Sequence, residues 1–491
     1  MKSDNSNKRL LGPFNRIEGD LEVQIQVNEG IIDSAWVNTP LFRGYEQILQ
    51  GKYPMDSLVY TPRICGICSV SQSVAAAKAI ANAQGVIPLK NGELSTNLIL
   101  ATENMADHLT HFYLFFMPDF ARSCYASKSW FKQVSKRFKA QVGTAVKDVL
   151  PARASFLHLT GIMAGKWPHS LAIQPGGTTK PIAAQERIKL LTLIKSFRHF
   201  LQQSLFGVEL ETLCELQNYQ QLLSFVEQNP DSDFASFIRI SRDLSLSGLG
   251  RAADNFMSYG AYSTEQQSLF KSGTWQQNYC ELDSNEIRED VANSWLKQTP
   301  KPKHPFEGET IPDIDEASSY SWCKAPRLKG NVMEVGAVAR QMVNQHPLIQ
   351  DMVNTTGGNV ETRIVARLLE LALVVPQMEI WAQQLVPNQP FCSTQKVPTN
   401  AQGFGLVEAA RGSLGHWVCI EDSKIKNYQI IAPTTWNFSP RDNQKNPGAL
   451  ELALENTPVG DEDNINGDNQ ASATVQHIIR SFDPCMVCTV H

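Results

Sequence analysis

The sequence predicts an α+β fold whose core is a mainly helical bundle, with β-hairpins and small sheets at the periphery. Two patterns carry this prediction: long segments in which apolar residues recur every three to four positions, and shorter segments near both ends in which apolar and polar residues alternate. With 42% hydrophobic residues among 491, the chain can bury a large core. No shift in composition marks a boundary, so we expect a single domain over residues 1–491.

The alternating segments predict the strands. Residues 20–38 alternate on both sides of residues 28–30, and two such runs around a polar turn that contains glycine are typical of a β-hairpin. Further strand-like pieces lie within 402–432, around Asp422. We therefore expect sheet structure near each end of the chain.

The helical segments have apolar positions at helical spacing and few polar breaks. They cover residues 73–83, 92–117, 183–216 and 361–374. We expect Pro118 and Pro376 to end the second and fourth helices, because proline has no N–H to donate. Helices of this kind pack against one another in a bundle.

Two stretches look irregular. Residues 217–330 are rich in Asn, Ser, Gly and Pro, which predicts a peripheral region of loops, short helices and strands. Residues 458–470 are polar and rich in Gly, Asn and Asp, which predicts a surface loop.

Charge and hydropathy exclude two classes of partner. The net charge is −5 and Lys and Arg are not clustered, so we expect no nucleic-acid binding. No run of about 18 or more apolar residues occurs, so we expect no direct membrane insertion. The polar start of the chain is not followed by the apolar core of a signal peptide, which predicts a cytoplasmic protein unless a partner chain carries an export signal.

The ten cysteines divide into two CxxC pairs and six single residues. A disulfide framework is not expected in a long chain without a secretion signal. Free cysteine is among the most buried residue types, so we expect the single residues to be small buried apolar groups. These are Cys124, Cys214, Cys280, Cys323, Cys392 and Cys419.

The paired cysteines are Cys65 with Cys68 and Cys485 with Cys488, near opposite ends of the chain. A CxxC turn lets two thiolates reach one metal, and two pairs make a four-sulphur set. A structural zinc site is the simplest interpretation of such pairs, but a zinc ribbon separates its pairs by only about 15–20 residues. A zinc staple between the chain ends and a redox pair stay open, although a redox pair does not explain two CxxC motifs.

The contexts of the two pairs carry a resemblance. RxCGxC at residues 63–68 and DPCxxCxxH at residues 483–491 resemble the two signatures of [NiFe] hydrogenase large subunits. Further similar blocks follow in order along the whole chain, at residues 16–19, 42–46, 111–113, 175–177, 333–336, 408–412 and 433–437. The resemblance implies the large-subunit fold and the nickel–iron subunit of a hydrogenase that binds H2 and cleaves it heterolytically.

The resemblance assigns the metals. Cys65, Cys68, Cys485 and Cys488 would bind nickel, and Cys68 and Cys488 would also bridge to an iron that carries CO and CN ligands. Soft thiolates suit a redox-active nickel. Thr434 would hydrogen-bond a cyanide.

The resemblance also implies a proton route. The Cys485 thiolate would take the proton released from H2 and pass it to Glu18, whose pKa burial can raise. From the residues alone, Glu18 would be expected to form a salt bridge with Arg16.

A second catalytic group is an arginine. Arg411 would place its guanidinium over the open metal position, where it stays charged and can orient hydrogen. Asp119 and Asp483 match the carboxylates that hold this arginine.

A buried magnesium and a partner chain complete the implied assembly. Glu46, His491 and the backbone carbonyl of Ile430 match the magnesium ligands, although a histidine is unusual for Mg²⁺. The chain has no iron–sulphur motif of its own, so electrons would leave through an iron–sulphur small subunit in a heterodimer, with a dimer of heterodimers as a further possibility.

Some positions depart from most of the family. Gln72, Asp20 and Ala410 stand where many members have His, His and Pro. Ile67 and Phe115 match the wall of the family's gas channel, where many catalytic members have smaller side chains. Bulkier side chains would slow oxygen more than hydrogen.

Residues 63–73, 101–120 and the C-terminal signature resemble the hydrogen-sensing, or regulatory, hydrogenases most closely. Such sensors turn over slowly and signal to a histidine kinase to control hydrogenase gene expression, and they lack the C-terminal extension that follows the last histidine in most catalytic members. We therefore expect a hydrogen sensor. The alternative is a cytoplasmic uptake hydrogenase that feeds electrons to a respiratory or photosynthetic chain. A quinone-reducing respiratory subunit of the same ancestry lacks the metal cysteines, which argues against that class.

Overall fold

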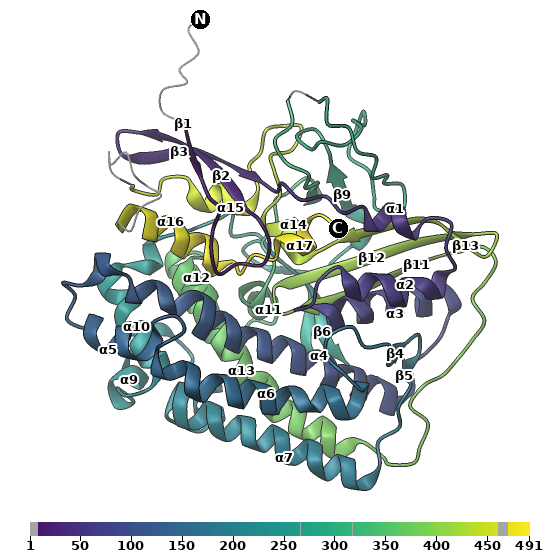
Figure 1. Cartoon of the computed structure of the whole chain (residues 1–491), viewed down its shortest axis with the longest axis horizontal. Helices are drawn as coiled ribbons and strands as arrows, with labels where there is room; N and C mark the ends of the chain where they lie inside the picture. Colours follow the sequence, from purple (N-terminus) through teal and green to yellow (C-terminus); the bar gives the residue numbers. More distant parts are fainter. Residues whose placement is uncertain (1–7, 266, 317, 460–469) are drawn as a thin grey trace, which may run out of the picture.

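The computed structural model describes residues 8–265, 267–316, 318–459 and 470–491. Long helices form one side of the molecule, and small sheets with the C-terminal segment form the other (Figure 1). The surface loop predicted at 458–470 lies almost wholly outside the described residues. No helix in the described part of the chain is long and apolar enough to cross a bilayer.

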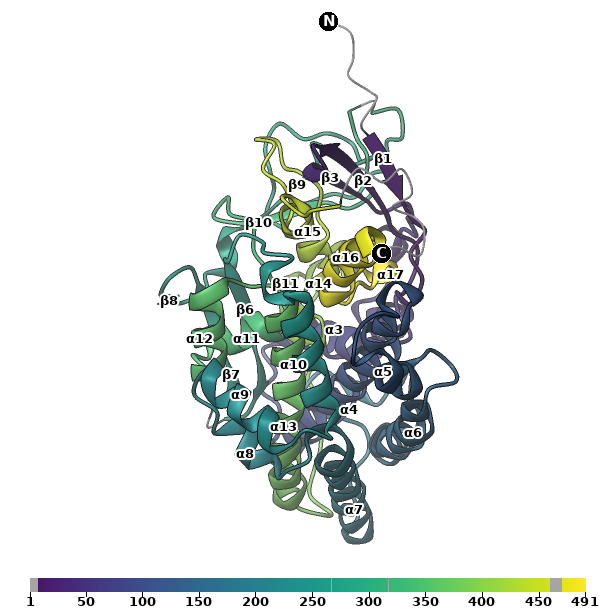
Figure 2. The same ribbon diagram turned by 90° about the vertical axis from the view of Figure 1, so that its left-hand side faces the viewer.

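The α-helices are α1 (Tyr45–Leu49), α2 (Ser57–Tyr60), α3 (Ser69–Gln84), α4 (Lys90–Thr110), α5 (Phe131–Phe138), α6 (Thr144–Ala164), α7 (Ala184–Phe200), α8 (Leu210–Cys214), α9 (Tyr219–Gln228), α10 (Asp233–Leu244), α11 (Ala337–Val343), α12 (Pro347–Thr356), α13 (Val360–Gln384), α14 (Pro433–Asn437), α15 (Ala449–Leu454), α16 (Gln470–Ser481) and α17 (Met486–Thr489). The predicted helical bundle is confirmed: α13 lies against α4 and α7, and α6 lies between α4 and α7 (Figure 2).

The strands form small antiparallel sheets, in the orders β1-β2-β3, β4-β5, β6-β7-β8, β9-β10 and β11-β12-β13. Their bounds are β1 (Lys8–Leu11), β2 (Glu22–Asn28), β3 (Ile31–Asn38), β4 (Ile173–Gln174), β5 (Gly177–Thr178), β6 (Phe256–Ser263), β7 (Ser268–Trp275), β8 (Tyr279–Cys280), β9 (Ile287–Asp290), β10 (Ala325–Leu328), β11 (Ala401–Ala409), β12 (Gly412–Glu421) and β13 (Lys424–Ile431). The predicted hairpin at 20–38 and the strands within 402–432 are confirmed.

Helix α13 does not end at Pro376, so that prediction is wrong. The proline inside the helix costs about 3 kcal/mol. The second half nevertheless buries Met378 and Trp381, which are 0% and 3% exposed. Each such side chain contributes about 1.5–3 kcal/mol, so burial outweighs the missing hydrogen bond.

The predicted helices at 92–117 and 183–216 are not regular over their whole length. After Thr110, α4 continues as a π-helical turn from His111 to Phe116 and then a 3-10 turn, at whose start Pro118 is tolerated. The segment predicted over 183–216 is interrupted at Gly207, which adopts a left-handed conformation with φ 77° and separates it from α8.

The stretch 217–330 contains loops, short helices and strands, as its composition predicts. It is not wholly peripheral, because α10 and β6 are largely buried. The prediction for the single cysteines is also partly wrong. All ten cysteines are free, but among the six single ones Cys323 alone is buried, and Cys280 on the short edge strand β8 is exposed.

Close packing of α3 on β11 fixes the first CxxC segment. A Cβ atom at Gly405 would lie 2.0 Å from the carbonyl oxygen of Ala75, and one at Gly403 would lie 2.2 Å from that of Ala79. Only glycine permits this approach of helix to sheet. The N-terminus of α3 directly follows Cys68, so this contact sets where the cysteine lies.

Candidate functional site

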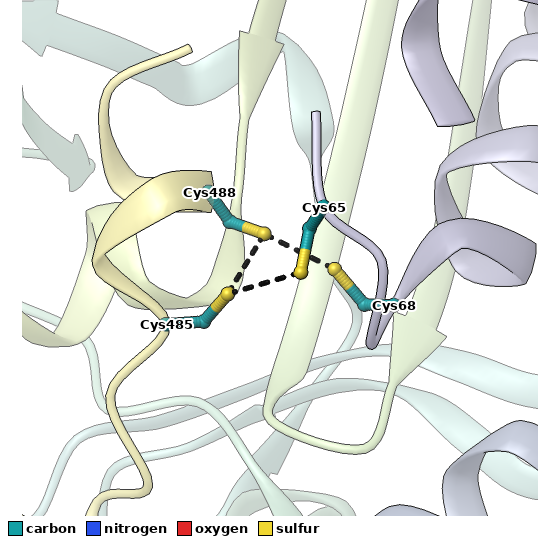
Figure 3. A group of neighbouring side chains, drawn as sticks. All are labelled: Cys65, Cys68, Cys485 and Cys488. Atoms are coloured by element: carbon teal, nitrogen blue, oxygen red, sulfur yellow. Dashed lines mark hydrogen bonds between the residues drawn. The ribbon is translucent and has the colours of Figure 1, made fainter. Parts of the chain in front are cut away.

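Two CxxC segments from opposite ends of the sequence meet in the interior (Figure 3). The Sγ atoms of Cys65, Cys68, Cys485 and Cys488 all lie within 4.8 Å of one another. Three of the separations are 3.0 Å for Cys485 with Cys488, 3.1 Å for Cys68 with Cys488 and 3.5 Å for Cys65 with Cys485. The predicted four-sulphur set is therefore confirmed as a cluster.

One arginine joins the two cysteine segments. Arg43 donates hydrogen bonds through Nη2 to the carbonyl oxygen of Ile64, at 2.6 Å, and to that of Val487. These carbonyls precede Cys65 and Cys488, so the guanidinium holds the two segments at a fixed separation. Sequence analysis gave Arg43 no role. The available signal was its place in the block at residues 42–46, beside Glu46.

The four cysteines shift one another's pKa values in opposite directions. The pKa of Cys65 lies well below the usual thiol value because Cys485, Cys488 and Cys68 hydrogen-bond to its sulphur. The same contacts, together with burial, hold the pKa values of Cys68 and Cys488 well above that value. Four thiolates at this spacing need a cation between them, and four soft sulphurs fit a soft or borderline transition metal.

Glu18 lies beside the C-terminal segment. Its carbonyl oxygen accepts a hydrogen bond from the N–H of Met486 at 2.7 Å, and its own N–H reaches the carbonyl of Pro484 at 3.5 Å. Burial first, and then the charge of Cys65, raises the pKa of the Glu18 carboxyl. The salt bridge with Arg16 that the residues alone predict is wrong, because Arg16 pairs with Asp119.

Arg411 is held by two buried carboxylates. Its Nε donates to the carbonyl of Asp483 at 2.9 Å and its Nη2 to Asp483 Oδ1 at 3.0 Å. Its Nη1 lies 2.8 Å from Asp107 Oδ2. Burial raises the pKa of Asp107 to about 7, although Arg411 opposes this. The guanidinium is 3% exposed, so its charge is fixed close to the sulphur cluster.

The prediction that Asp119 holds Arg411 is wrong. Asp119 binds Arg480, Nη1 to Oδ2 at 2.5 Å, and Arg16. Burial opposes its ionisation, but Arg480, His477 and Arg16 together lower its pKa. The carboxylate beside Arg411 is Asp107, on the same helical segment. Sequence reasoning missed it, and the signal was its place among the buried residues of the block at 101–120.

Thr434 contacts the cysteine segment. It is the second residue of the short helix α14, and its Oγ1 accepts a hydrogen bond from the N–H of Cys485 at 3.2 Å. The side chain is 2% exposed. The hydroxyl proton stays available for another acceptor at the cluster.

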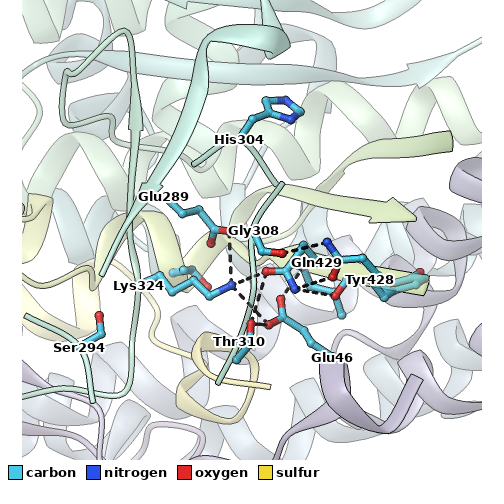
Figure 4. Close-up of polar contacts among 12 residues, drawn as sticks. Glu46, Glu289, Ser294, His304, Gly308, Thr310, Lys324, Tyr428 and Gln429 are labelled. Atoms are coloured by element: carbon cyan, nitrogen blue, oxygen red, sulfur yellow. Dashed lines mark hydrogen bonds and ion pairs between the residues drawn. The ribbon is translucent and has the colours of Figure 1, made fainter. Parts of the chain in front are cut away.

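A cluster of polar side chains surrounds Glu46 (Figure 4). His491 connects it to the sulphur cluster, because its Nδ1 lies 2.9 Å from the carbonyl oxygen of Cys488. Lys324 Nζ lies 3.4 Å from Glu46 Oε2, 3.4 Å from Glu289 Oε2 and 2.6 Å from Gln429 Oε1. Burial disfavours the Glu46 anion, but Lys324, His491 and Thr310 outweigh it and lower its pKa to about 2. Glu289 Oε1 is buried without a hydrogen-bond partner in the described chain.

The structure brings the predicted magnesium ligands together. His491 Nε2 lies 3.3 Å from Glu46 Oε1, and the N–H of Ile430 donates to the same oxygen at 2.8 Å. They line a cavity of about 20 Å³. The carboxylates of Glu46 and Glu289 form a donor set that fits a hard cation, and Glu289 Oε1 has no hydrogen-bond partner in the described chain. The part assigned to the carbonyl of Ile430 stays a prediction.

The departures from the family pattern are placed as follows. Gln72 Oε1 accepts a hydrogen bond from His416 Nε2 at 2.8 Å, and the other ring nitrogen of His416 lies 2.9 Å from the hydroxyl of Tyr428. Ile67 and Phe115 are half-buried. Ile67 packs against the main core, directly before Cys68. Their predicted place on a gas channel stays a prediction.

The chain resembles known proteins over its whole length. The family model described as nickel-dependent hydrogenase matches residues 43–145 and 144–491. An uptake hydrogenase large subunit from Bradyrhizobium diazoefficiens is 29% identical, covering 99% of this chain and 96% of that protein. A periplasmic [NiFeSe] hydrogenase large subunit from Desulfomicrobium baculatum is 28% identical, covering 100% and 96%.

The fold of the chain is also similar to that of solved structures. The Ni-Fe-Se hydrogenase from D. vulgaris Hildenborough in its reduced state superposes with a TM-score of 0.83 at 27% identity, covering 99% of both chains. The fold predicted from the sequence is therefore confirmed by known structures as well as by the helices and sheets described above.

Proposed function

The chain belongs to the nickel-dependent hydrogenase family as an [NiFe] hydrogenase large subunit, and from this premise we propose that it oxidises H2 in an uptake role. The observation that carries the proposal is the four-sulphur cluster with Glu18 on one side and Arg411 on another. A relative named an uptake hydrogenase large subunit supports this role over the sensor that the sequence led us to expect.

The cysteines are the proposed metal ligands. All four would bind nickel, and Cys68 and Cys488 would also hold an iron that carries CO and CN. The hydroxyl of Thr434, which already accepts from the N–H of Cys485, has its proton free to donate to a cyanide.

When bound, the nickel–iron group supplies the redox-active metals at which H2 is split into two protons and two electrons. The chain's residues move the proton. Cys485 Sγ accepts the proton first and passes it to Glu18. The raised pKa of Glu18 favours this second transfer, because it reduces the difference in pKa between the carboxyl and a thiol. The backbone of Glu18 pairs with that of Cys485, which keeps the two residues side by side.

Arg411 orients hydrogen without taking part in proton transfer. Asp107 and Asp483 surround its guanidinium and, with neighbouring thiolates, raise its pKa well above the usual value, although burial opposes this. A permanent positive charge beside the cluster polarises a small molecule that approaches the metals.

The second cluster is the proposed magnesium site. Glu46, His491 and the carbonyl of Ile430 hold the cation, and Glu289 lies across the same cavity. A hard cation there would tie the C-terminal histidine to α1, next to the cysteine segment.

An iron–sulphur small subunit is the proposed electron exit. The relatives carry the words large subunit in their names, and the described part of this chain has no second cysteine cluster to relay electrons. The heterodimer, its further pairing and its cytoplasmic location stay predictions.

Hydrogen sensing is the second candidate. Three positions favour this role: Ile67 and Phe115 are bulky, and Gln72 stands where many members of the family have histidine. In that role the heterodimer would signal to a histidine kinase and turn over slowly.

One experiment separates the two roles. The gene is deleted, and two quantities are compared with the parent strain: H2 consumption by whole cells, and the induction of hydrogenase genes by H2. Loss of consumption with normal induction supports uptake. Loss of induction, restored by the intact gene, contradicts uptake and supports sensing.

A further inference from the structure

Helix α3 has no N-terminal cap of its own, because the residue at its N-cap is Cys68. Ser, Thr, Asp or Asn usually fills this position, and its side-chain oxygen accepts from the first free N–H groups. The Cys68 side chain instead points into the sulphur cluster, 3.1 Å from Cys488 Sγ (Figure 3). The first N–H groups of α3 therefore need an acceptor from elsewhere.

Glu103, on α4, supplies that acceptor. Its Oε2 accepts from the N–H of Val70 at 2.8 Å, and its Oε1 accepts from the N–H of Ser71 at 2.9 Å. The hydroxyls of Ser69 and Ser71 donate at 3.3 Å and 3.1 Å, and the indole N–H of Trp167 donates at 3.0 Å. Glu103 is 2% exposed. Five donors thus surround one buried carboxylate, in an arrangement that suits its ionised form.

The charge of this carboxylate acts on the neighbouring cysteine. The N-terminus of a helix carries a positive partial charge, which stabilises a nearby thiolate and makes it a weaker electron donor. The negative charge of Glu103 lies at the same end of α3 and offsets this positive partial charge. Burial raises the pKa of Glu103 to about 7, so the carboxyl is ionised in alkaline solution.

We infer that Glu103 is a positioning residue of the metal centre, which fixes the Cys68 side chain by capping α3 and strengthens the Cys68 thiolate as an electron donor. The inference rests on the proposed iron group, because Cys68 is one of the thiolates proposed to bridge to iron. A more electron-rich iron lowers the stretching frequency of bound CO.

The test is the variant Glu103→Gln, with Glu93→Gln on the same helix as the matched control. A glutamine keeps the shape but is uncharged, and its NH2 group faces an N–H that needs an acceptor. Nickel content, melting temperature and the infrared CO band are measured at alkaline pH. We expect Glu103→Gln to keep its nickel, melt at a lower temperature and shift the CO band to higher wavenumber, while Glu93→Gln leaves the band unchanged. A lower melting temperature with an unshifted band would show a purely structural cap and overturn the inference.

A milder variant decides the case if Glu103→Gln does not assemble. Ser71→Ala removes one hydroxyl donor that favours the ionised carboxylate, so near neutral pH less negative charge should remain on Glu103 and the CO band should shift to higher wavenumber. An unchanged band, or a shift to lower wavenumber, would overturn the inference. Wild-type protein that contains nickel but has no CO band would instead contradict the proposed iron group, so the two failures are distinguishable.

Discussion

Asp107 and Arg411 form an ion pair in the interior, with 2.8 Å between Oδ2 and Nη1. Both residues are nearly inaccessible to solvent, at 4% and 3% exposed. Asp483 holds the opposite side of the same guanidinium. The direction in which Arg411 faces the sulphur cluster therefore depends on two carboxylates, one from α4 and one from the C-terminal segment.

Replacing Asp107 by Asn should slow hydrogen oxidation by about 10- to 100-fold, the range expected for losing one buried charged contact. Nickel should stay bound, because the cysteines are untouched. Turnover with a dye as acceptor is measured together with nickel content. A variant with normal turnover would show that Asp483 alone orients Arg411.

Asp119→Asn is the matched control. It breaks a buried pairing with Arg480 and Arg16 that lies away from Arg411. We expect a loss of about 3–5 kcal/mol in unfolding free energy and little change in turnover per bound nickel. The opposite pattern, a stable but inactive Asp119 variant, would restore the role that the sequence suggested.

Glu18→Gln should lower turnover by about 10²- to 10⁴-fold, because an amide cannot relay a proton. Nickel content should not change. Glu22→Gln, on β2 close by in the sequence, should behave like the wild type. Near-normal turnover in Glu18→Gln would remove Glu18 from the proton path.

The pH profile tests the same residue. Glu18 must be ionised to accept a proton, and burial raises its pKa above 4.5, the ordinary value. Hydrogen oxidation should therefore decline, as the pH falls, at a pH above 4.5. This acid limb should disappear from the residual activity of Glu18→Gln.

Cys485→Ser or Cys65→Ser should prevent an active centre from assembling, since an alkoxide is a poor ligand for a soft metal. Cys214→Ala and Cys280→Ala should stay active, because neither lies near the four-sulphur cluster, and Cys280 is exposed. Metal content and turnover are compared across the four variants. Equal damage in both sets would show that the single cysteines have been misjudged.

The double variant Ile67→Val with Phe115→Leu tests the gas channel. If both side chains narrow the path, the variant should keep its nickel but lose activity after timed exposure to oxygen. Truncation should also cost some stability, about 0.5–1.5 kcal/mol for Ile→Val alone. A less stable variant with unchanged oxygen sensitivity would identify both residues as ordinary core packing and weaken the case for sensing.

The sequence predicts the helical bundle, the hairpin and the four-cysteine set well, because each has a local pattern. It does not predict which carboxylate faces Arg411. Asp107 and Asp119 lie on one helical segment that changes from α to π to 3-10 winding, and helical spacing cannot follow that change. Pro376 fails as a helix end for a related reason: tertiary burial of Met378 and Trp381 overrides a local rule.

Metal analysis of the chain purified with its small subunit, after expression with its maturation proteins, tests the central claim most directly. The four sulphurs within 4.8 Å should hold about one nickel per chain, with hydrogen-dependent dye reduction in the same sample. Zinc at full occupancy, without nickel and without hydrogen-dependent dye reduction, would contradict the account and leave a structural zinc staple between the two ends of the chain.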